Sequence, residues 1–467
     1  MKKNNYVVYV RHESDDAARV SWNYEADCAS VDGAKVYKFE VEELYPSFAA
    51  MVEDTSLAAG KTVGTRSYYE GLCRGAAVYE ITENGGEGAV ALANGLFAKL
   101  IPFAVDGERV VTVDQFGAHG DGQSYDEAAI MAAFHYAAAN VVEFESDVYV
   151  QNDTIVLTRG GLKINGRGAR ICNSYFVRKT EDVINIDFKV LGTGEKYIED
   201  LTICNLELYC SETHGAGTLY CARDHFIFDS YFTKNMTIRG CRFIAPDAPN
   251  THISNVNIRM AENMLFENNY MQSLSKSREY SGGLWIWSDP EFKYTTKNVT
   301  IRNNYIEKTS HDEVIAVFMG HFDGIVIENN TVYTHDEPEG SASHHAVGFG
   351  VWDVPTSVKN VRFVGNKMDV VSINDFMMLS HASNVLVADN DITLRANSAS
   401  QPLVYGVFRT TANAENYKNA GIPEVRQENI EICNNRITVY NEKEIPLCFN
   451  CGEGFNVHDN DFKCIVE

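Results

Sequence analysis

The stretch KNVTIRNNYI, from Lys297 to Ile306, is one of eight ten-residue segments that share a single pattern. The third, fifth and tenth positions are apolar in all eight, and the eighth is Asn in all but the first, which has Cys241. The segments begin 28, 35, 26, 36, 24, 45 and 25 residues apart, at Lys234, Glu262, Lys297, Asp323, Lys359, Ser383, Glu428 and Glu453. A repeat of this length is typical of a solenoid.

The pattern predicts a strand, a sharp corner and a second strand. Val299 and Ile301 are two residues apart, so they share the buried face of a strand, and Ile306 begins the next one. Asn suits the corner because it tolerates left-handed backbone, and stacked copies would let each corner Asn bond its neighbours above and below. Hairpins in a β-sandwich would need Gly-rich two-residue loops, which this spacing lacks. The sequence therefore predicts an all-β fold, a parallel β-helix.

Composition narrows the possible partners and compartments. The chain has 467 residues, of which 45% are hydrophobic, enough for a large core. A formal net charge of −24 argues against a nucleic-acid partner and disfavours an anionic polymer. No apolar run is long enough to span a membrane or to form a signal-peptide core. The 11 Cys residues show no framework spacing, so we expect reduced thiols in a cytoplasmic protein, secreted only if a signal has been removed.

The first quarter of the chain precedes the clear repeats. We expect residues 1–108 to form a small β-rich cap, with strands at YVVYV and AKVYKFEVEEL and hairpins in residues 66–101. Helix formers fill residues 126–140, so a helix is expected there, covering the open first coil. Residues 109–467 would then form the β-helix domain.

The segment VTVDQFGAHGDGQSYDEAAI, from Val111, resembles the "DFGA-x-GDG" entry segment of the pectate lyase-like superfamily. Its matching residues are Val113, Phe116, Gly117, Ala118, Gly120, Asp121 and Gly122. That superfamily includes polygalacturonase-type glycosidases and phage tailspikes. The resemblance covers about residues 66–467 and implies a right-handed parallel β-helix, a single-stranded solenoid of about ten coils. The motif is specific for fold and nearly silent on the reaction.

A second apolar segment follows each corner and predicts a third sheet. These segments begin at His225, Ile253, Gly282, Asp312, His345, Asp375, Pro402 and Pro446. In the superfamily that this chain resembles, a sugar groove usually runs along that sheet. We place it between about residues 255 and 381, where the longest loops enter. Trp285 and Trp287 are two apart and should face outward together, with Leu284 and Ile286 buried, as a stacking platform for a sugar ring.

Carboxylates cluster in the same window. Glycoside hydrolysis requires two, one protonated and one ionised. Neighbouring coils are about 4.8 Å apart and alternate residues of one strand about 7 Å, so both retention and inversion are geometrically open. The expected catalytic pair is Asp312 or Glu313 with Asp289 or Asp353. The other residues expected to bind substrate are Arg259, Asn257, His311, His344, His345, Trp352, Asp375 and His381.

Three functions remain open at this point. The first is a glycoside hydrolase, or a relative that moves a glycosyl group within its substrate, acting on an oligo- or polysaccharide without a cofactor. The second is a polysaccharide lyase or uronate epimerase, which would need positive charge, often Ca²⁺. The third is a non-catalytic, tailspike-like carbohydrate-binding protein. The His spacing matches no zinc motif. We expect a monomer or, by analogy with tailspikes, a homotrimer.

Overall fold

The structure is a computed structural model. It describes residues 5–12, 34–86, 88–173, 188–210, 226–245, 254–274, 283–289, 291, 293–310, 313–336, 345–350, 356–372, 374–398, 402–410 and 427–466. The chain divides into two compact units. The first comprises residues 1–172 and 201–207, and the second comprises residues 173–200 and 208–467. Within the described residues, no helix has the length and apolar character needed to cross a membrane.

The first unit begins with a two-stranded antiparallel sheet and a five-stranded mixed sheet, in which the β3–β4 pairing is parallel. β1 (Asn5–His12) pairs with β2 (Ala34–Val41), which confirms the strands expected there. A five-stranded sheet follows, with α1 (Phe48–Val52) after its first strand. Its order is β3 (Glu43–Tyr45), β4 (Thr62–Thr65), β5 (Ala77–Thr82), β7 (Phe97–Ile101) and β6 (Ala89–Ala91).

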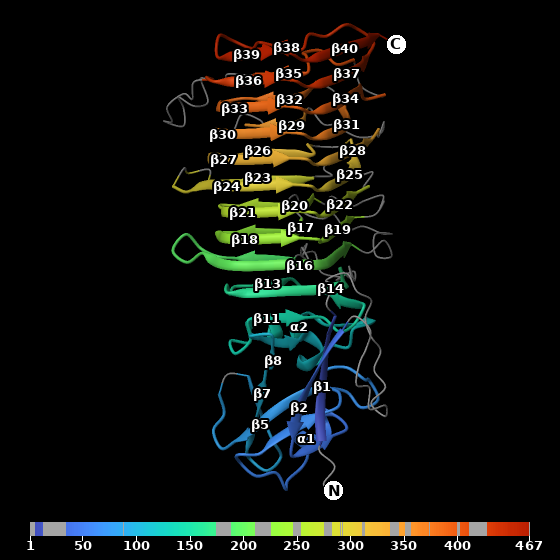
Figure 1. The fold of residues 1–467 in the computed structure, drawn as a ribbon, viewed down its shortest axis with the longest axis vertical. Helices are drawn as coiled ribbons and strands as arrows, with labels where there is room; N and C mark the ends of the chain where they lie inside the picture. The colour runs from blue at the N-terminus through green and yellow to red at the C-terminus, as the bar shows by residue number, and fades with distance from the viewer. Residues whose placement is uncertain are drawn as a thin grey trace, which may run out of the picture. The chain divides into compact units, whose positions relative to one another are not determined.

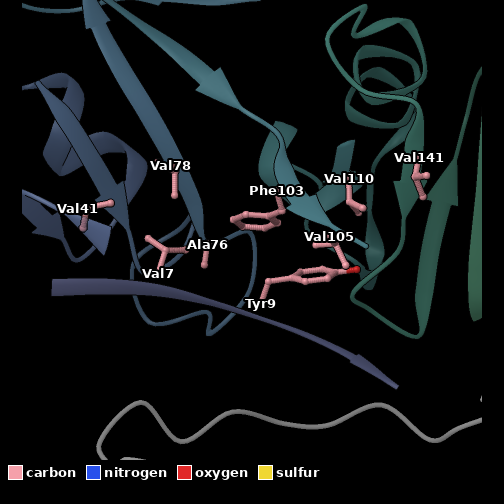
Figure 2. Packing of buried hydrophobic residues seen from close by; sticks show 9 residues of the cluster. All are labelled: Val7, Tyr9, Val41, Ala76, Val78, Phe103, Val105, Val110 and Val141. Carbon is pink, nitrogen blue, oxygen red and sulfur yellow. The ribbon is translucent and has the colours of Figure 1, made fainter. Parts of the chain in front are cut away.

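A compact apolar cluster joins these sheets (Figure 2). The Tyr9 ring of β1 lies 5.1 Å from the ring of Phe103 in β8 (Phe103–Val105), and Val7, Val41 and Val78 are almost fully buried in the same cluster. β8 pairs with β9 (Glu108–Thr112), and β9 pairs in parallel with β11 (Val141–Glu143). The first compact unit runs to residue 172 and also includes residues 201–207.

The rest of the first unit carries the entry segment. It contains η1 (Val113–Phe116), β10 (Asp121–Tyr125), α2 (Glu127–His135), β12 (Val148–Gln151), β13 (Ile155–Leu157) and β14 (Leu162–Asn173). α2 is shorter than the helix expected over residues 126–140, and it ends where Tyr136 turns to extended backbone. Ile130 and Phe134 are fully buried on its inner face, and the helix packs against η1 and β13.

A buried acidic network holds the entry segment together. Asp114 accepts hydrogen bonds from the Tyr149 hydroxyl at 2.5 Å, the Ser146 hydroxyl at 2.8 Å and the Glu145 N–H at 3.1 Å. Glu145 in turn accepts from the Thr112 hydroxyl and the Gly75 N–H. Burial and the nearby Asp114 charge together raise the pKa of Glu145 to about 7. Two acidic side chains, those of Asp114 and Glu145, therefore lie side by side in this network, and Glu145 is partly protonated at neutral pH.

This network predicts a pH dependence of stability. The unfolded chain releases the Glu145 proton near the ordinary pKa of 4.5, while the folded chain keeps it until about pH 7. The folded state then binds more protons in this window, so the free energy of unfolding falls as pH rises. Because Glu145 is partly exposed, we expect a loss of about 1 kcal/mol. Urea denaturation of Glu145→Gln, which keeps the acceptor oxygen, should show a shallower decline between pH 5 and 8. An unchanged slope would contradict the assignment.

The second unit is built from stacked parallel strands (Figure 1). The first ladder consists of β18 (Thr233–Arg239), β21 (Glu262–Glu267), β24 (Thr295–Arg302), β27 (Gly320–Glu328), β30 (Thr356–Val364), β33 (Ala382–Ala388), β36 (Ile430–Cys433) and β39 (Phe455–His458). The second ladder consists of β19 (Arg242–Ala245), β22 (Tyr270–Ser273), β25 (Tyr305–Thr309), β28 (Thr331–His335), β31 (Lys367–Ser372), β34 (Asp391–Ala396), β37 (Arg436–Asn441) and β40 (Asp461–Val466). β16 (Ile198–Cys210) contributes residues to both units.

The third sheet contains every segment expected for it. In the second unit its order is β15 (Phe188–Leu191), β17 (Phe226–Tyr231), β20 (Ser254–Arg259), β23 (Leu284–Trp287), β26 (Ile315–Phe318), β29 (His345–Phe349), β32 (Asp375–Leu379), β35 (Phe408–Arg409) and β38 (Cys448–Phe449). All pairings within it are parallel. The expected parallel β-helix is confirmed.

Corner asparagines form the ladder that the repeat predicted. The Asn330 side chain accepts from the Asn304 N–H at 3.0 Å and donates to the Ile301 carbonyl and to Asn366. The bond from a backbone N–H to the next Asn Oδ1 recurs along the ladder, from Cys241 through Asn269 and Asn390 to Asn435 and Asn460. The left-handed residue, however, is the one before the buried Asn, as at Asn303 with φ 56°.

A second asparagine ladder runs along the exposed second position of the repeat. Asn298 donates to Asn263 at 2.9 Å, and Asn263 donates to Asn235 at 3.1 Å. Asn298 has φ 53°, a conformation that Gly adopts at no steric cost. The two ladders therefore offer matched buried and exposed positions in neighbouring coils.

We expect Asn330→Ala to lower the free energy of unfolding by about 3 kcal/mol, because it leaves buried N–H and C=O groups without partners. Asn298→Gly removes the exposed side chain but keeps the backbone conformation, so its cost should stay below about 1 kcal/mol. Urea denaturation of both variants measures the difference. Equal losses would mean that the buried ladder contributes no more than the exposed one.

Candidate functional site

Trp285 and Trp287 lie on the same side of β23. Leu284 and Ile286 are fully buried on the other side, as expected. Trp285 lies opposite Asn257 of β20 and Ala316 of β26 in the sheet register. However, the Trp285 side chain is only 8% exposed, because it packs against Ala316, Phe318 and Met378. The expectation that both rings stand open to solvent is therefore wrong for Trp285, while its role in binding stays a prediction.

Trp287 belongs to a continuous stack of aromatic and guanidinium groups. The Arg259 guanidinium lies 4.4 Å from the Trp287 ring and 4.7 Å from the Tyr231 ring. On its other side, the Trp287 ring lies 4.5 Å from Phe318. These four residues occupy successive rungs of the third sheet. Each cation–π contact adds about 0.5–2 kcal/mol, so the stack fixes the orientation of Trp287.

Asp229 forms an ion pair with Arg259 of this stack. Its carboxylate lies 3.6 Å from Arg259 Nε and accepts a hydrogen bond from Asn257 Nδ2 at 2.6 Å. Asn257 and Asp229 are both buried. The structure thus brings the expected Asn257 and Arg259 together with an acidic residue that the sequence reasoning missed.

A buried charged group lies further along the third sheet. His345 Nδ1 is 2.9 Å from Asp375 Oδ1, and Asp375 Oδ2 is 2.8 Å from Arg409 Nε. The Asp375 side chain is fully buried, and those of His345 and Arg409 are 5% and 11% exposed. The register places Arg409 opposite Met378, on the strand next to that of Asp375.

Met378 connects the charged group with the tryptophans. Arg409 Nη2 lies 3.7 Å from Met378 Sδ, and Met378 packs in one cluster with Trp285 and Phe318. The aromatic stack and the charged group are therefore parts of one continuous site, called here the third-sheet site. Its members are Asp229, Tyr231, Asn257, Arg259, Trp285, Trp287, Phe318, His345, Asp375, Met378 and Arg409.

Glu313 lies at the edge of this site. The Val314 N–H donates to the Ala346 carbonyl at 2.9 Å, and Ile315 is opposite Val347. Glu313 lies two residues before Ile315, just as His345 lies two residues before Val347 and Asp375 two before Met377. Its side chain is almost completely buried. Glu313 thus precedes β26 at the position equivalent to His345 and Asp375, which begin β29 and β32.

The other expected residues divide into two groups. Asp289 accepts the N–H groups of Glu291 at 3.0 Å and Lys293 at 2.8 Å, so it shapes the loop that follows β23. His381 occupies the left-handed corner after β32, where burial lowers its pKa to about 4 and keeps it uncharged at neutral pH. A second group lies outside the described residues and stays predicted: His311, Asp312, His344, Trp352 and Asp353.

Four polar atoms of the third-sheet site are buried without a hydrogen-bond partner among the described residues. They are Asn257 Oδ1, Trp287 Nε1, Asp375 Oδ2 and Arg409 Nε. The last two lie close enough for an ion pair but not in line for a hydrogen bond. Buried polar atoms are nearly always hydrogen-bonded, so this concentration calls for an explanation.

The cysteines that the structure describes are all free thiols. Cys448 and Cys451, the C-x-x-C pair, are each partly buried, and the Cys451 thiol donates to the backbone carbonyls of Phe408 and Phe449. Among the described residues one group has the spacing of metal ligands, Glu431, Cys433 and His458. It lies on the first ladder, outside the third-sheet site.

Comparison with solved structures finds phage tailspikes and a polygalacturonase, all with TM-scores below 0.5. The tailspike protein of Acinetobacter phage vB_ApiP_P1 is 14% identical with a TM-score of 0.48, covering 91% of this chain and 71% of its own. Tailspike protein 2 of bacteriophage CBA120 is 10% identical with a TM-score of 0.43, covering 90% of this chain and 56% of its own. An exopolygalacturonase from Thermotoga maritima is 11% identical with a TM-score of 0.42, covering 78% and 93%.

These similarities concern the fold and carry no statement about activity. Phage tailspikes and a polygalacturonase are the kinds of protein that the resemblance of the entry segment named. The chain spans only about half to two thirds of the length of the first tailspikes it matches, 56% and 64%. No protein-family model matches the chain, and no curated protein resembles it in sequence.

The charged group predicts non-additive stability effects. Arg409→Met leaves Asp375 facing only His345, and Asp375→Asn leaves a buried guanidinium, so each should cost about 3 kcal/mol. The double variant should cost less than the sum by about 1–3 kcal/mol, because neither charge is then left alone. Urea denaturation measures all three. Asp391→Asn, which breaks the exposed pair with Arg436, is the control and should cost below about 1 kcal/mol. Additive losses would contradict the coupling.

Proposed function

We propose that the protein is a carbohydrate-active enzyme, a glycoside hydrolase that acts on an oligo- or polysaccharide at the third-sheet site. The observation that carries the proposal is the set of buried polar atoms without a hydrogen bond on Asn257, Trp287, Asp375 and Arg409, of which the last two are held only by their mutual ion pair. A sugar presents many hydroxyl groups, each of which both donates and accepts hydrogen bonds. The hydroxyl groups of such a ligand would form hydrogen bonds with the amide oxygen of Asn257, the indole N–H of Trp287, the carboxylate of Asp375 and the guanidinium of Arg409. These four groups lie on different strands of the third sheet.

The aromatic groups support the same class of ligand. Trp287 is held at a fixed angle by Arg259 and Phe318, and its partly exposed ring carries an N–H at its edge. A ring fixed before binding loses little conformational entropy when a pyranose packs against it. Binding sites of this kind combine apolar walls with a few placed polar groups.

The charged group supports catalysis rather than binding alone. Burying a histidine, a carboxylate and a guanidinium costs several kcal/mol of desolvation, which a purely structural site could avoid with apolar residues. We assign Glu313 and Asp375 as the carboxylate pair. They occupy equivalent positions of coils two rungs apart, so their backbones are separated by about 9–10 Å. This favours the wider pairs of inverting glycosidases, at roughly 6.5–9.5 Å, over the closer retaining pairs.

Each residue then has a role. Asp375 lies against the positive charge of Arg409, so we assign it the carboxylate that takes a proton from the attacking water. Glu313 would donate its proton to the glycosidic oxygen as the bond to the leaving sugar breaks. His345 lies on the strand between Glu313 and Asp375, and its Nδ1 is hydrogen-bonded to Asp375, so it fixes the position of that carboxylate. This pair replaces Asp289 as the preferred partner of Glu313, because the Asp289 oxygens are engaged by backbone N–H groups.

The lyase alternative has less support. A lyase or epimerase needs positive charge to neutralise a uronate carboxylate. Both arginines of the site already face carboxylates, Arg259 with Asp229 and Arg409 with Asp375. The net charge of −24 also disfavours an acidic polysaccharide.

Release of reducing ends from a panel of neutral oligosaccharides tests the proposal. We expect Glu313→Gln and Asp375→Asn to lower kcat by about 10²–10⁴-fold, because each removes a proton-transfer group. Trp287→Ala should mainly raise KM, and the exposed Asp391→Asn is the control with unchanged kinetics. Circular dichroism checks that each variant is folded. If Asp375→Asn does not fold, Asp375→Glu replaces it in the kinetic test, because Glu keeps the negative charge but moves the carboxylate oxygens.

Two outcomes would change the assignment. Loss of activity in Asp312→Asn or Asp353→Asn, with Asp375→Asn fully active, would return the pair to those predicted positions. Binding of the sugars without any release of reducing ends would favour the non-catalytic carbohydrate-binding protein. An increase in absorbance from unsaturated uronates on acidic polysaccharides, lost with chelator, would favour the lyase.

A further inference from the structure

Three ligand-type side chains meet on the outer side of the first ladder, outside the third-sheet site. Glu431 and Cys433 are two residues apart on β36, so they lie on the same face of that strand. His458 of β39 lies directly opposite Cys433 in the sheet register. The ligand atoms of Glu431, Cys433 and His458 all lie within 4.8 Å of one another. One carboxylate, one thiol and one imidazole therefore converge from two adjacent rungs.

The imidazole of His458 lies between two carboxylates. Its Nδ1 is 2.8 Å from Asp459 Oδ2, and its Nε2 is 3.2 Å from Glu431 Oε1. A neutral imidazole carries only one N–H, so one of these contacts would bring two lone pairs together. Either a second proton or a metal cation resolves that conflict.

The thiol of Cys433 is buried beside these groups, with the residue only 6% exposed. A divalent cation at this place would stabilise the thiolate and the neighbouring carboxylate together.

We propose that Glu431, Cys433 and His458 form a binding site for a transition-metal ion, with Zn²⁺ as the ion that the donor set fits best. Thiolate sulfur, imidazole nitrogen and carboxylate oxygen are its usual ligands. Zinc-to-ligand distances of about 2.0–2.3 Å require ligand atoms about 3.3–3.8 Å apart in a tetrahedron. Small side-chain rotations close the present spacing, and a water molecule completes the fourth position.

Asp459 supplies the outer support of this site. By accepting the Nδ1–H of His458, it leaves the Nε2 lone pair directed toward Glu431. Carboxylates that orient a ligating histidine in this way commonly change metal affinity by about 10–100-fold. Asp459 is therefore a positioning residue in this arrangement, and the metal would be held by the other three side chains.

The site would fasten the last rung of the first ladder. The Ile430 and Ile432 side chains of β36 are almost fully buried, whereas their register partners in β39 are not: Val457 is 37% exposed and Phe455 is partly exposed. The apolar surface of β39 thus contributes less to holding this rung in place. A metal bridging β36 and β39 binds the folded state only, so it stabilises this rung by mass action.

Metal titration of the reduced full-length protein tests the proposal. Calorimetry with ZnCl₂ should show one site per chain, and Co²⁺ should give thiolate charge-transfer absorption with tetrahedral d–d bands. Cys433→Ser should abolish the charge-transfer absorption. His458→Asn and Glu431→Gln should weaken binding at least about tenfold, and Asp459→Asn about 10–100-fold. Cys464→Ser, on the neighbouring strand β40, is the matched control and should leave binding unchanged.

Thermal unfolding and the pH dependence of affinity show whether these three side chains bind the metal. Zn²⁺ should raise the midpoint of thermal unfolding of the wild type and of Cys464→Ser, but not of His458→Asn, which remains informative if Cys433→Ser fails to fold. Affinity should fall as pH falls, because protons compete for the thiolate and imidazole. Charge-transfer absorption that persists in Cys433→Ser, or equal Zn²⁺ affinity in the wild type and His458→Asn, would overturn the proposal.

Discussion

The corner hydrogen bonds of the buried asparagines are the constraint on which the second unit depends. At each corner the chain turns between two ladders, and the N–H and C=O groups there cannot pair within a strand. Asn304, Asn330, Asn366 and their equivalents supply those missing partners, each bonding the backbone of one neighbouring coil and the side chain of the next. Leaving such groups unpaired costs about 1–3 kcal/mol each, so a slip of one residue at any corner is strongly disfavoured. The ladder therefore fixes the register of every coil.

That register determines which residues meet in the third-sheet site. The starts of the repeats lie 24 to 45 residues apart, yet the strands remain aligned rung by rung. Length differences are absorbed between the strands, while the corners hold the alignment. Trp287 lies beside Arg259 and Phe318 for this reason, although 28 and 31 residues separate them in the chain. His345, Asp375 and Arg409 are likewise joined by position in the coil rather than by proximity in sequence.

The sequence predicted what repeats and alternation control. It located the buried Asn corner and all eight third-sheet segments, and it placed Leu284 and Ile286 in the core. It missed the exposed ladder through Asn298, although Asn occupies the second position in six of the eight segments. It also missed the contacts of Asp229 and Arg409, because these require the register between coils to be known to a single residue. Exposure of Trp285 was misjudged because alternation tells which side a residue faces but not what packs over that side.

Stacking also restricts where charges can lie. Identical charges on successive rungs would be about 4.8 Å apart and would repel by roughly 3–4 kcal/mol at an effective dielectric constant of 20. Charges therefore alternate in sign across neighbouring rungs, as in Glu262 with Lys297, Glu267 with Arg302 and Asp391 with Arg436. The same alternation occurs in the buried group, where Asp375 lies against Arg409 of the next rung. Around His458 the pattern changes, because its two ring nitrogens both lie against carboxylates, those of Glu431 and Asp459. A cation bound there would restore the alternation that the rest of the solenoid maintains with its own side chains.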